Sequence, residues 1–271
     1  MKKSFTKVIS TLFPNRVVSF AYHQLTNPQT RKLRPHELHT LNKSEKEIIR
    51  FQEFDIQLYT WPGGENSVLL IHGWEGQAGN FSDFIEELIA HNYTVYAFDG
   101  PSHGFSSRGS TSLFEFTTLV GQLIKKYNVT KLVSHSFGGV AATYALSVNK
   151  DITIDKYLLF TTPDKFTERI DDVAIKIGIT TKVKKKLIQR IEEEVRHDIS
   201  VLNVSNFVKS VNVRKALILH DLNDTIIPIE QSRNVSENWD VCALHPVENT
   251  GHFRILRTKS VLEKAIDFLN N

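Results

Sequence analysis

The sequence predicts an α/β protein built on a doubly wound, mostly parallel sheet. Short apolar runs such as 67–71 and 216–220 have the continuous hydrophobicity of strands buried on both faces. They alternate along the chain with segments whose apolar residues recur at helical spacing. One run, 132–133, breaks into a turn of small residues that opens a helix. Alternation of this kind predicts parallel strands between two layers of helices.

The predicted elements follow one another with short connections. A Pro-Gly-Gly turn at 62–64 separates a first pair of strands from the next strand, and Ser112 with Glu115 forms a capping box at the start of a helix. The expected strands are 48–51, 54–61, 67–71, 95–98, 132–133, 157–160, 216–220 and 241–244. The expected helices are 81–89, 113–127, 230–238 and 259–269, with one more after the turn at 134–138.

Two parts of the chain depart from this alternation. Residues 1–44 lack clear periodicity and form a lead-in, and residues 161–212 hold amphipathic helices in place of the next strand. We therefore expect a core of 45–160 and 213–271 with a helical cap, 161–212, inserted in it. Ligands of parallel sheets bind outside the carboxyl ends of the strands, where this insertion must emerge. We expect the cap to cover Ser136 and to line a pocket that sets substrate size.

Composition excludes several classes of protein. A net charge of +3 over 271 residues, without an aromatic-studded basic groove, argues against a nucleic-acid partner. The single cysteine, Cys242, excludes an intramolecular disulfide and a cysteine-cluster zinc site. No apolar run approaches the length of a membrane span, and the N-terminus lacks a clean signal peptide. We expect a cytoplasmic protein that does not associate with membranes.

The turn at 134–138 predicts a nucleophilic serine. It has the pattern small-x-Ser-x-Gly, in which a sharp strand-to-helix bend lifts the central hydroxyl, here of Ser136, above the sheet. The helix that follows supplies backbone N–H groups able to stabilise an oxyanion. Ser134 is a second candidate hydroxyl, but it would put Leu132 at a position that needs a small residue. The motif therefore predicts an acyl-transferring enzyme with Ser136 as the nucleophile.

A serine nucleophile needs a general base and an acid in loops after later strands. Asp221 and Asp224 both follow the strand 216–220; we favour Asp224 because it lies out in the loop, and Asp221 is then a helper or a turn residue. In the next loop Gly251 lets His252 project toward the strand ends, whereas the rival His245 ends a strand beside a proline. The predicted catalytic residues are Ser136, Asp224 and His252.

An oxyanion hole is predicted from two backbone N–H groups. The loop after strand 67–71 contains His72-Gly73-Trp74, where the Trp74 N–H can face a reacting carbonyl together with the N–H of Phe137. We expect His72 to hydrogen-bond within its loop. His103, in the turn at 99–106, has no partner at metal-ligand spacing, so no metal site is predicted.

With these segments in order, the chain resembles the α/β-hydrolase superfamily, and its oxyanion loop resembles that of small bacterial carboxylesterase-like members. The resemblance implies hydrolysis of a small-molecule carboxylic ester with no cofactor and no metal. A serine nucleophile disfavours the members that use aspartate. A thioesterase, lipase or carbon–carbon bond hydrolase remains an alternative, as does a non-catalytic binding or signalling protein; oligomeric state stays open. The matching segments are 72–74, 99–106, 134–138, 224–228 and 251–252.

Overall fold

The computed structural model describes residues 10–30, 32–195 and 198–271, and they form two compact units. The larger unit, Gln29–Asp164 with Val204–Asn271, carries the sheet. The smaller one contains helix α2 and the helices between Lys165 and Asn203. The first nine residues of the expected lead-in lie outside the described residues. None of the described helices combines the length and apolar character needed to cross a lipid bilayer.

Within the described residues, eight strands form one mixed sheet in the order β1-β2-β4-β3-β5-β6-β7-β8. The first three strands in this order pair antiparallel, and β4, β3, β5, β6, β7 and β8 are mutually parallel. The predicted doubly wound, mostly parallel sheet is thus confirmed. The strands are β1 (Glu45–Phe51), β2 (Phe54–Trp61), β3 (Ser67–Ile71), β4 (Thr94–Phe98), β5 (Lys131–His135), β6 (Ile154–Phe160), β7 (Val213–Asp221) and β8 (Cys242–Val247).

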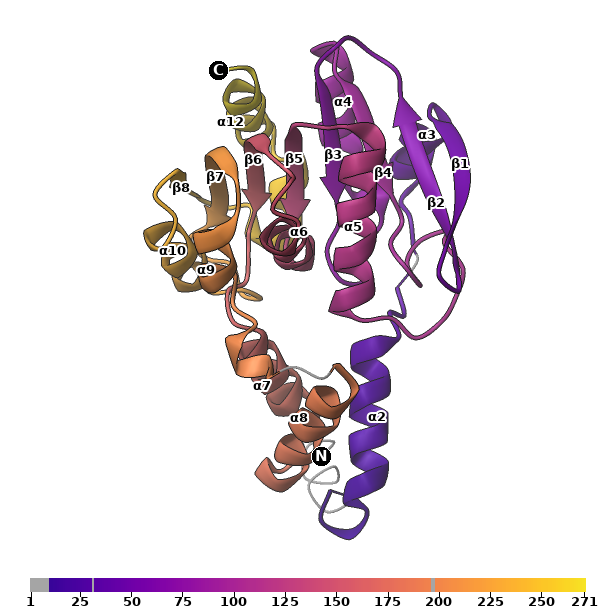
Figure 1. Ribbon diagram of the computed structural model, residues 1–271, viewed down its shortest axis with the longest axis vertical. Helices are drawn as coiled ribbons and strands as arrows, with labels where there is room; N and C mark the ends of the chain where they lie inside the picture. The colour runs from indigo at the N-terminus through magenta and orange to yellow at the C-terminus, as the bar shows by residue number, and fades with distance from the viewer. Residues whose placement is uncertain (1–9, 31, 196–197) are drawn as a thin grey trace. The chain divides into compact units, whose positions relative to one another are not determined.

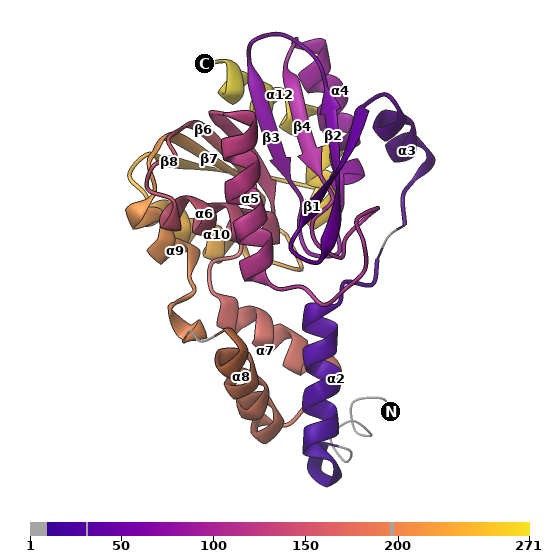
Figure 2. The same ribbon diagram turned by 45° about the vertical axis from the view of Figure 1, so that its right-hand side comes forward.

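Helices cover both faces of this sheet (Figures 1 and 2). Helices α5 and α6 pack together on one face, and α4 and α12 pack together on the other. Short turns of helix connect several strands and loops. The helices of this unit are α3 (Pro35–Asn42), α4 (Ser82–Ala90), α5 (Leu113–Tyr127), α6 (Phe137–Val148), α9 (Val204–Phe207), α10 (Ile229–Glu237), α11 (Gly251–Arg254) and α12 (Lys259–Asn270), with 3-10 turns η1 (Ala78–Phe81), η3 (Val208–Ser210) and η4 (Ile255–Arg257).

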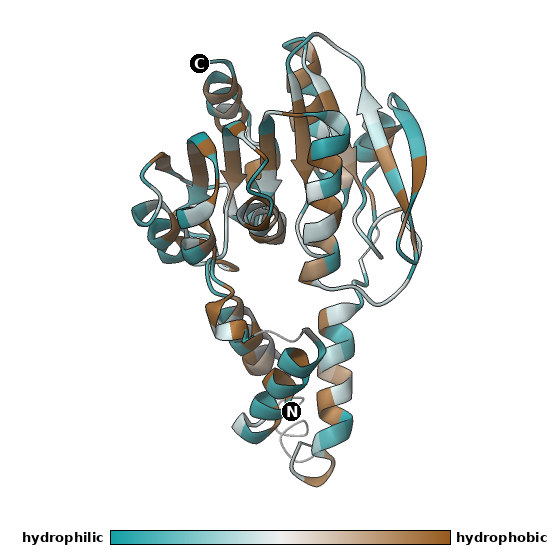
Figure 3. Cartoon of the chain, in the orientation of Figure 1, coloured by the Kyte–Doolittle hydropathy of each residue, from teal (hydrophilic) through white to brown (hydrophobic). Residues whose placement is uncertain are grey.

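One cluster of the core lies between the sheet and helices α4 and α12. Figure 3 shows the central strands as strongly hydrophobic, in keeping with burial on both faces. Phe84 of α4 meets Phe160 of β6 edge to face, with 5.5 Å between ring centroids, and neither is exposed. Each such buried side chain contributes roughly 1.5–3 kcal/mol to folding. This packing fixes the strand ends from which the loops of the site emerge.

The smaller unit is a set of helices: α2 (Pro14–Thr26), α7 (Phe166–Ile177), α8 (Thr181–Val195) and the turn η2 (Ile199–Val201). Helix α8 packs on α2, where Arg190 lies over the Tyr22 ring at 4.2 Å and donates to the Ser19 hydroxyl. Leu187 is fully buried in this unit, whereas Ile175 is exposed. The expectation that this region lines a substrate pocket stays a prediction.

Candidate active site

Ser136 lies at a strained turn between β5 and α6. Its φ of 52° and ψ of −122° fall in a region that non-glycine residues rarely adopt. The turn is held by its own N–H, which donates to the carbonyls of Phe160 and Thr161. A Cβ at Gly138 would overlap the carbonyl oxygens of Ile71 and His72, so a larger residue there would force strand and helix apart. Backbone strain held this firmly is a feature of functional positions.

The rival hydroxyl of Ser134 is in a different environment. It is fully buried, and its Oγ lies 3.0 Å from the Tyr157 hydroxyl, which donates to the Gly139 carbonyl at 3.2 Å. Burial raises the pKa of Tyr157 to about 12, so the phenol stays protonated near neutral pH. Ser136, by contrast, is partly exposed. Of the two serines, only Ser136 is accessible to solvent.

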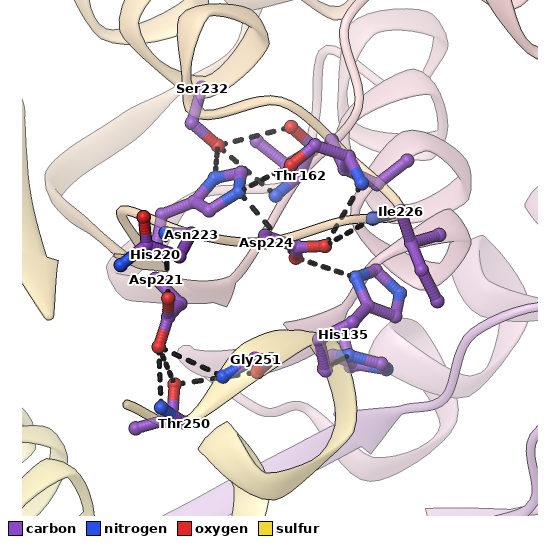
Figure 4. Close-up of polar contacts among 12 residues, drawn as sticks. His135, Thr162, His220, Asp221, Asn223, Asp224, Ile226, Ser232, Thr250 and Gly251 are labelled. Carbon is purple, nitrogen blue, oxygen red and sulfur yellow. Dashed lines mark hydrogen bonds and ion pairs between the residues drawn. The ribbon is translucent and has the colours of Figure 1, made fainter. Parts of the chain in front are cut away.

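Asp224 and His252 meet although 28 residues separate them in the sequence. The His252 Nδ1–H donates to Asp224 Oδ2 at 2.8 Å, and both side chains are buried. Asp224 Oδ1 accepts the N–H groups of Ile226 and Ile227 at 2.8 and 3.0 Å (Figure 4). Burial alone would raise the pKa of Asp224, but the bonds from His252 and these amides outweigh it and lower the pKa. Asp224 is therefore a carboxylate, which orients the His252 ring with Nδ1 as the donor nitrogen.

Asp221 binds the backbone that precedes His252 instead of the imidazole. Its Oδ2 accepts the N–H groups of Thr250 and Gly251 and the Thr250 hydroxyl (Figure 4). Burial favours the protonated acid, but these donors prevail and hold the pKa of Asp221 below its usual range. The other rival of the sequence, His245, is exposed on β8. The two aspartates thus support one loop in two ways, Asp224 through the ring and Asp221 through the backbone.

The loop after β3 lies against the serine. A Cβ placed on Gly73 would be 3.2 Å from the Ser136 Cβ, and the Trp74 and Phe137 rings meet at 5.4 Å. Phe137 is the first residue of α6, so its N–H has no acceptor within the helix. The structure thus places both sequence-predicted oxyanion residues beside Ser136, one from each loop.

His72 joins two loops and stays neutral. Its Nδ1–H donates to the Gly73 carbonyl, and its Nε2 accepts the Gly100 N–H at 2.9 Å. Complete burial lowers the pKa of His72 well below its ordinary value. In the neighbouring turn, Asp99 accepts from the Tyr59 hydroxyl and the Ala78 amide, which makes it a structural residue. Among the described residues, no group of three His, Cys, Asp or Glu could hold a metal ion.

Two buried histidines near the site were not predicted from the sequence. His220, at the end of β7, has Nε2 2.9 Å from the Ile227 carbonyl and Nδ1 2.6 Å from the Ser232 hydroxyl (Figure 4). His135 precedes the serine and reaches the backbone of His252. Burial lowers the pKa of both imidazoles. In the sequence, His135 stands just before Ser136, and His220 ends the predicted strand 216–220, four residues before Asp224.

Comparisons with known proteins agree with this architecture. Residues 68–180 match the model of the alpha/beta hydrolase family, a range that includes Ser136 but not the loops that carry Asp224 and His252. The chain is 37% identical over 89 residues to a dihydrolipoyllysine-residue acetyltransferase component of an acetoin cleaving system from Cupriavidus necator, covering 31% of this chain and 24% of that protein. It is 28% identical over 130 residues to a pimeloyl-[acyl-carrier protein] methyl ester esterase from Xylella fastidiosa, covering 48% of this chain and 49% of that protein.

Solved structures show the same fold. An esterase from Exiguobacterium antarcticum matches with a TM-score of 0.67 at 16% identity, covering 84% of this chain and 100% of that one. Identity this low establishes the fold and not the activity. The chain spans about a quarter of the Cupriavidus relative and about half of the Xylella relative, so their activities do not transfer as a whole.

Proposed function

Because this chain has the α/β-hydrolase fold, we propose that it is a serine hydrolase that cleaves carboxylic esters of small molecules through an acyl-enzyme intermediate. The observation that carries the proposal is the 2.8 Å bond between His252 and Asp224, in the two loops that follow β7 and β8. With a serine held at positive φ at the end of β5, it supplies a nucleophile, a base and an acid from three strand ends.

In the proposed mechanism, Ser136 Oγ attacks the ester carbonyl while its proton passes to His252 Nε2. The carbonyl oxygen becomes an oxyanion that accepts the Trp74 and Phe137 N–H groups, and each such donor is worth roughly 2.7–4 kcal/mol in the transition state. Asp224 keeps the Nδ1–H oriented and stabilises the imidazolium. The carbon–oxygen bond to the alcohol then breaks, and the alcohol leaves with the proton from His252.

The second half of the reaction restores the serine. His252 takes a proton from water as the water attacks the acyl-enzyme, and the same two N–H groups hold the second oxyanion. Its collapse releases the carboxylic acid and returns the proton to Ser136. The cycle consumes one water and one ester, and it leaves every protein group as it began.

Turnover of short-chain p-nitrophenyl esters tests the proposal. We expect hydrolysis by the wild-type protein and covalent labelling of Ser136 by a fluorophosphonate, read by mass spectrometry. Absence of both would favour the second candidate, a non-catalytic ligand-binding protein of the same fold. A thioester, a long-chain ester and a carbon–carbon diketone substrate, assayed in parallel, distinguish the related hydrolase activities. The Xylella relative, an esterase by name, favours the ester.

A further inference from the structure

His135 connects the two halves of the candidate site. It is the last residue of β5 and directly precedes Ser136 in the sequence. Its side chain is buried. Its Nε2 is 2.9 Å from the backbone carbonyl oxygen of His252, a residue 117 positions away, and the two rings lie 4.9 Å apart. Neither contact involves Ser136, Asp224 or the loop at 72–74.

The protonation state of His135 follows from its partner. A carbonyl oxygen only accepts, so the His135 Nε2 must carry the proton. Burial, and secondarily the nearby His252, lower the pKa of His135 to about 3. The ring is therefore neutral near neutral pH, with its single proton on Nε2. A neutral neighbour does not oppose the positive charge that His252 takes up when it accepts a proton from serine.

The carbonyl that His135 holds belongs to a short helix. Helix α11 has four residues, Gly251–Arg254, and two residues at its start have positive φ: Asn249, just before the helix, and Gly251, its first residue. Asp221 binds the amides of Thr250 and Gly251, which fixes the backbone before His252. No other side-chain bond to the His252 backbone is seen among the described residues. Asp221 thus holds the backbone just before His252, and His135 holds the carbonyl of His252 itself.

From this geometry we propose that His135 is a positioning residue for the proposed reaction: its Nε2–H anchors the His252 backbone so that the imidazole stays aligned between Asp224 and Ser136. The inference rests on the proposed serine-hydrolase function. The role is separate from those of the nucleophile and the acid, because His135 hydrogen-bonds the backbone that carries the His252 imidazole. A donor of similar length at position 135 should preserve the anchor, and an apolar ring should remove it.

Two variants separate the donor from the volume of the side chain. His135→Phe keeps an aromatic ring but leaves the His252 carbonyl without a donor, whereas His135→Gln keeps a neutral N–H group. We expect His135→Phe to lower kcat for p-nitrophenyl acetate at least tenfold with KM within twofold of wild type, and His135→Gln to retain most of the activity. The same substitutions at the exposed His245 serve as matched controls and should leave both constants unchanged.

A second measurement does not depend on catalysis. In the proton NMR spectrum the hydrogen-bonded Nδ1–H of His252 should give a far-downfield signal in the wild type, keep it in His135→Gln and lose or broaden it in His135→Phe. An unchanged signal in a folded His135→Phe protein, or kcat within twofold of wild type, would overturn the proposal. A wild-type protein that shows the signal but hydrolyses no ester would refute the proposed function and leave the anchor to be judged by the NMR comparison alone.

Discussion

Replacing Asp224 by asparagine should disable the site while leaving the fold in place. Asp224 Oδ1 accepts two amides at 2.8 and 3.0 Å, so the asparagine carbonyl oxygen stays on that side. Its NH2 group then takes the place of Oδ2, 2.8 Å from His252 Nδ1. Because this NH2 can only donate, Nδ1 must become an acceptor and the imidazole proton moves to Nε2. In that tautomer Nε2 cannot take the proton of Ser136.

The expected magnitude comes from this change of tautomer. A histidine held in the wrong tautomer by the same substitution in a serine triad lowers kcat about 10⁴-fold. That factor corresponds to roughly 5 kcal/mol of activation free energy. The free energy of unfolding should change by only about 1 kcal/mol, because the amides of Ile226 and Ile227 keep their acceptor.

Asp221→Asn provides the contrast. Asp221 Oδ2 receives the Thr250 N–H, the Thr250 hydroxyl and the Gly251 N–H, and Oδ1 receives the Asn223 N–H. An asparagine amide turns an N–H toward one of these donors in either orientation. We expect a loss of about 1–3 kcal/mol in the free energy of unfolding.

Two measurements on both aspartate variants check these expectations: kcat with p-nitrophenyl acetate, and the free energy of unfolding in urea. An Asp224→Asn protein within tenfold of wild-type kcat, or an Asp221→Asn protein that loses more kcat than Asp224→Asn, would refute the reasoning.

Three further outcomes are expected. Ser136→Ala should abolish ester turnover and fluorophosphonate labelling with an unchanged melting temperature, whereas Ser134→Ala should keep both activities; the reverse pattern would reassign the nucleophile. Gly138→Ala should destabilise the protein by about 1–3 kcal/mol, since its Cβ meets two carbonyl oxygens that cannot move apart cheaply; equal urea midpoints would contradict this. Stability should also fall in acid. Buried histidines with lowered pKa bind protons only after unfolding, so their stabilisation is present above an unfolded pKa of ~6.5 and is lost as pH falls. With three such groups the slope can reach ~4 kcal/mol per pH unit, and an equal free energy of unfolding at pH 7.5 and 5.5 would argue against it. These groups are His72, His135 and His220.

Much of the fold could be predicted because its signals are local. Continuous apolar runs, a capping box at Ser112 and the turn residues at 62–64 each specify an element without its partners. The strand boundaries were less accessible. Strand β8 extends through Pro246 to Val247, and it tolerates a proline because it lies at the edge of the sheet. The sequence alone does not tell which strand is an edge.

The candidate site likewise has residues that the sequence could predict and contacts that it could not. Position in the chain was enough to single out Ser136, Asp224 and His252 as candidates, since each lies in a loop after a predicted strand. The contacts of His135 and His220 were not predicted, because each bonds a backbone carbonyl: His135 that of His252, 117 positions away, and His220 that of Ile227, in the loop after its own strand. The pairing of α2 with α8 was equally out of reach, since nothing in either helix names its partner.

Beneath the turn at Ser136, the buried pair of Ser134 and Tyr157 links two positions of the core. Ser134 stands where glycine is common in such turns, and its hydroxyl is bonded to that of Tyr157. A change of Ser134 to glycine alone would remove one partner of the phenol and leave it the Gly139 carbonyl and the Thr143 hydroxyl. A change of Tyr157 to phenylalanine alone would remove the hydroxyl that the Ser134 Oγ contacts. Each residue therefore makes the other harder to replace. Changing Ser134 and Tyr157 together leaves neither hydroxyl without the other.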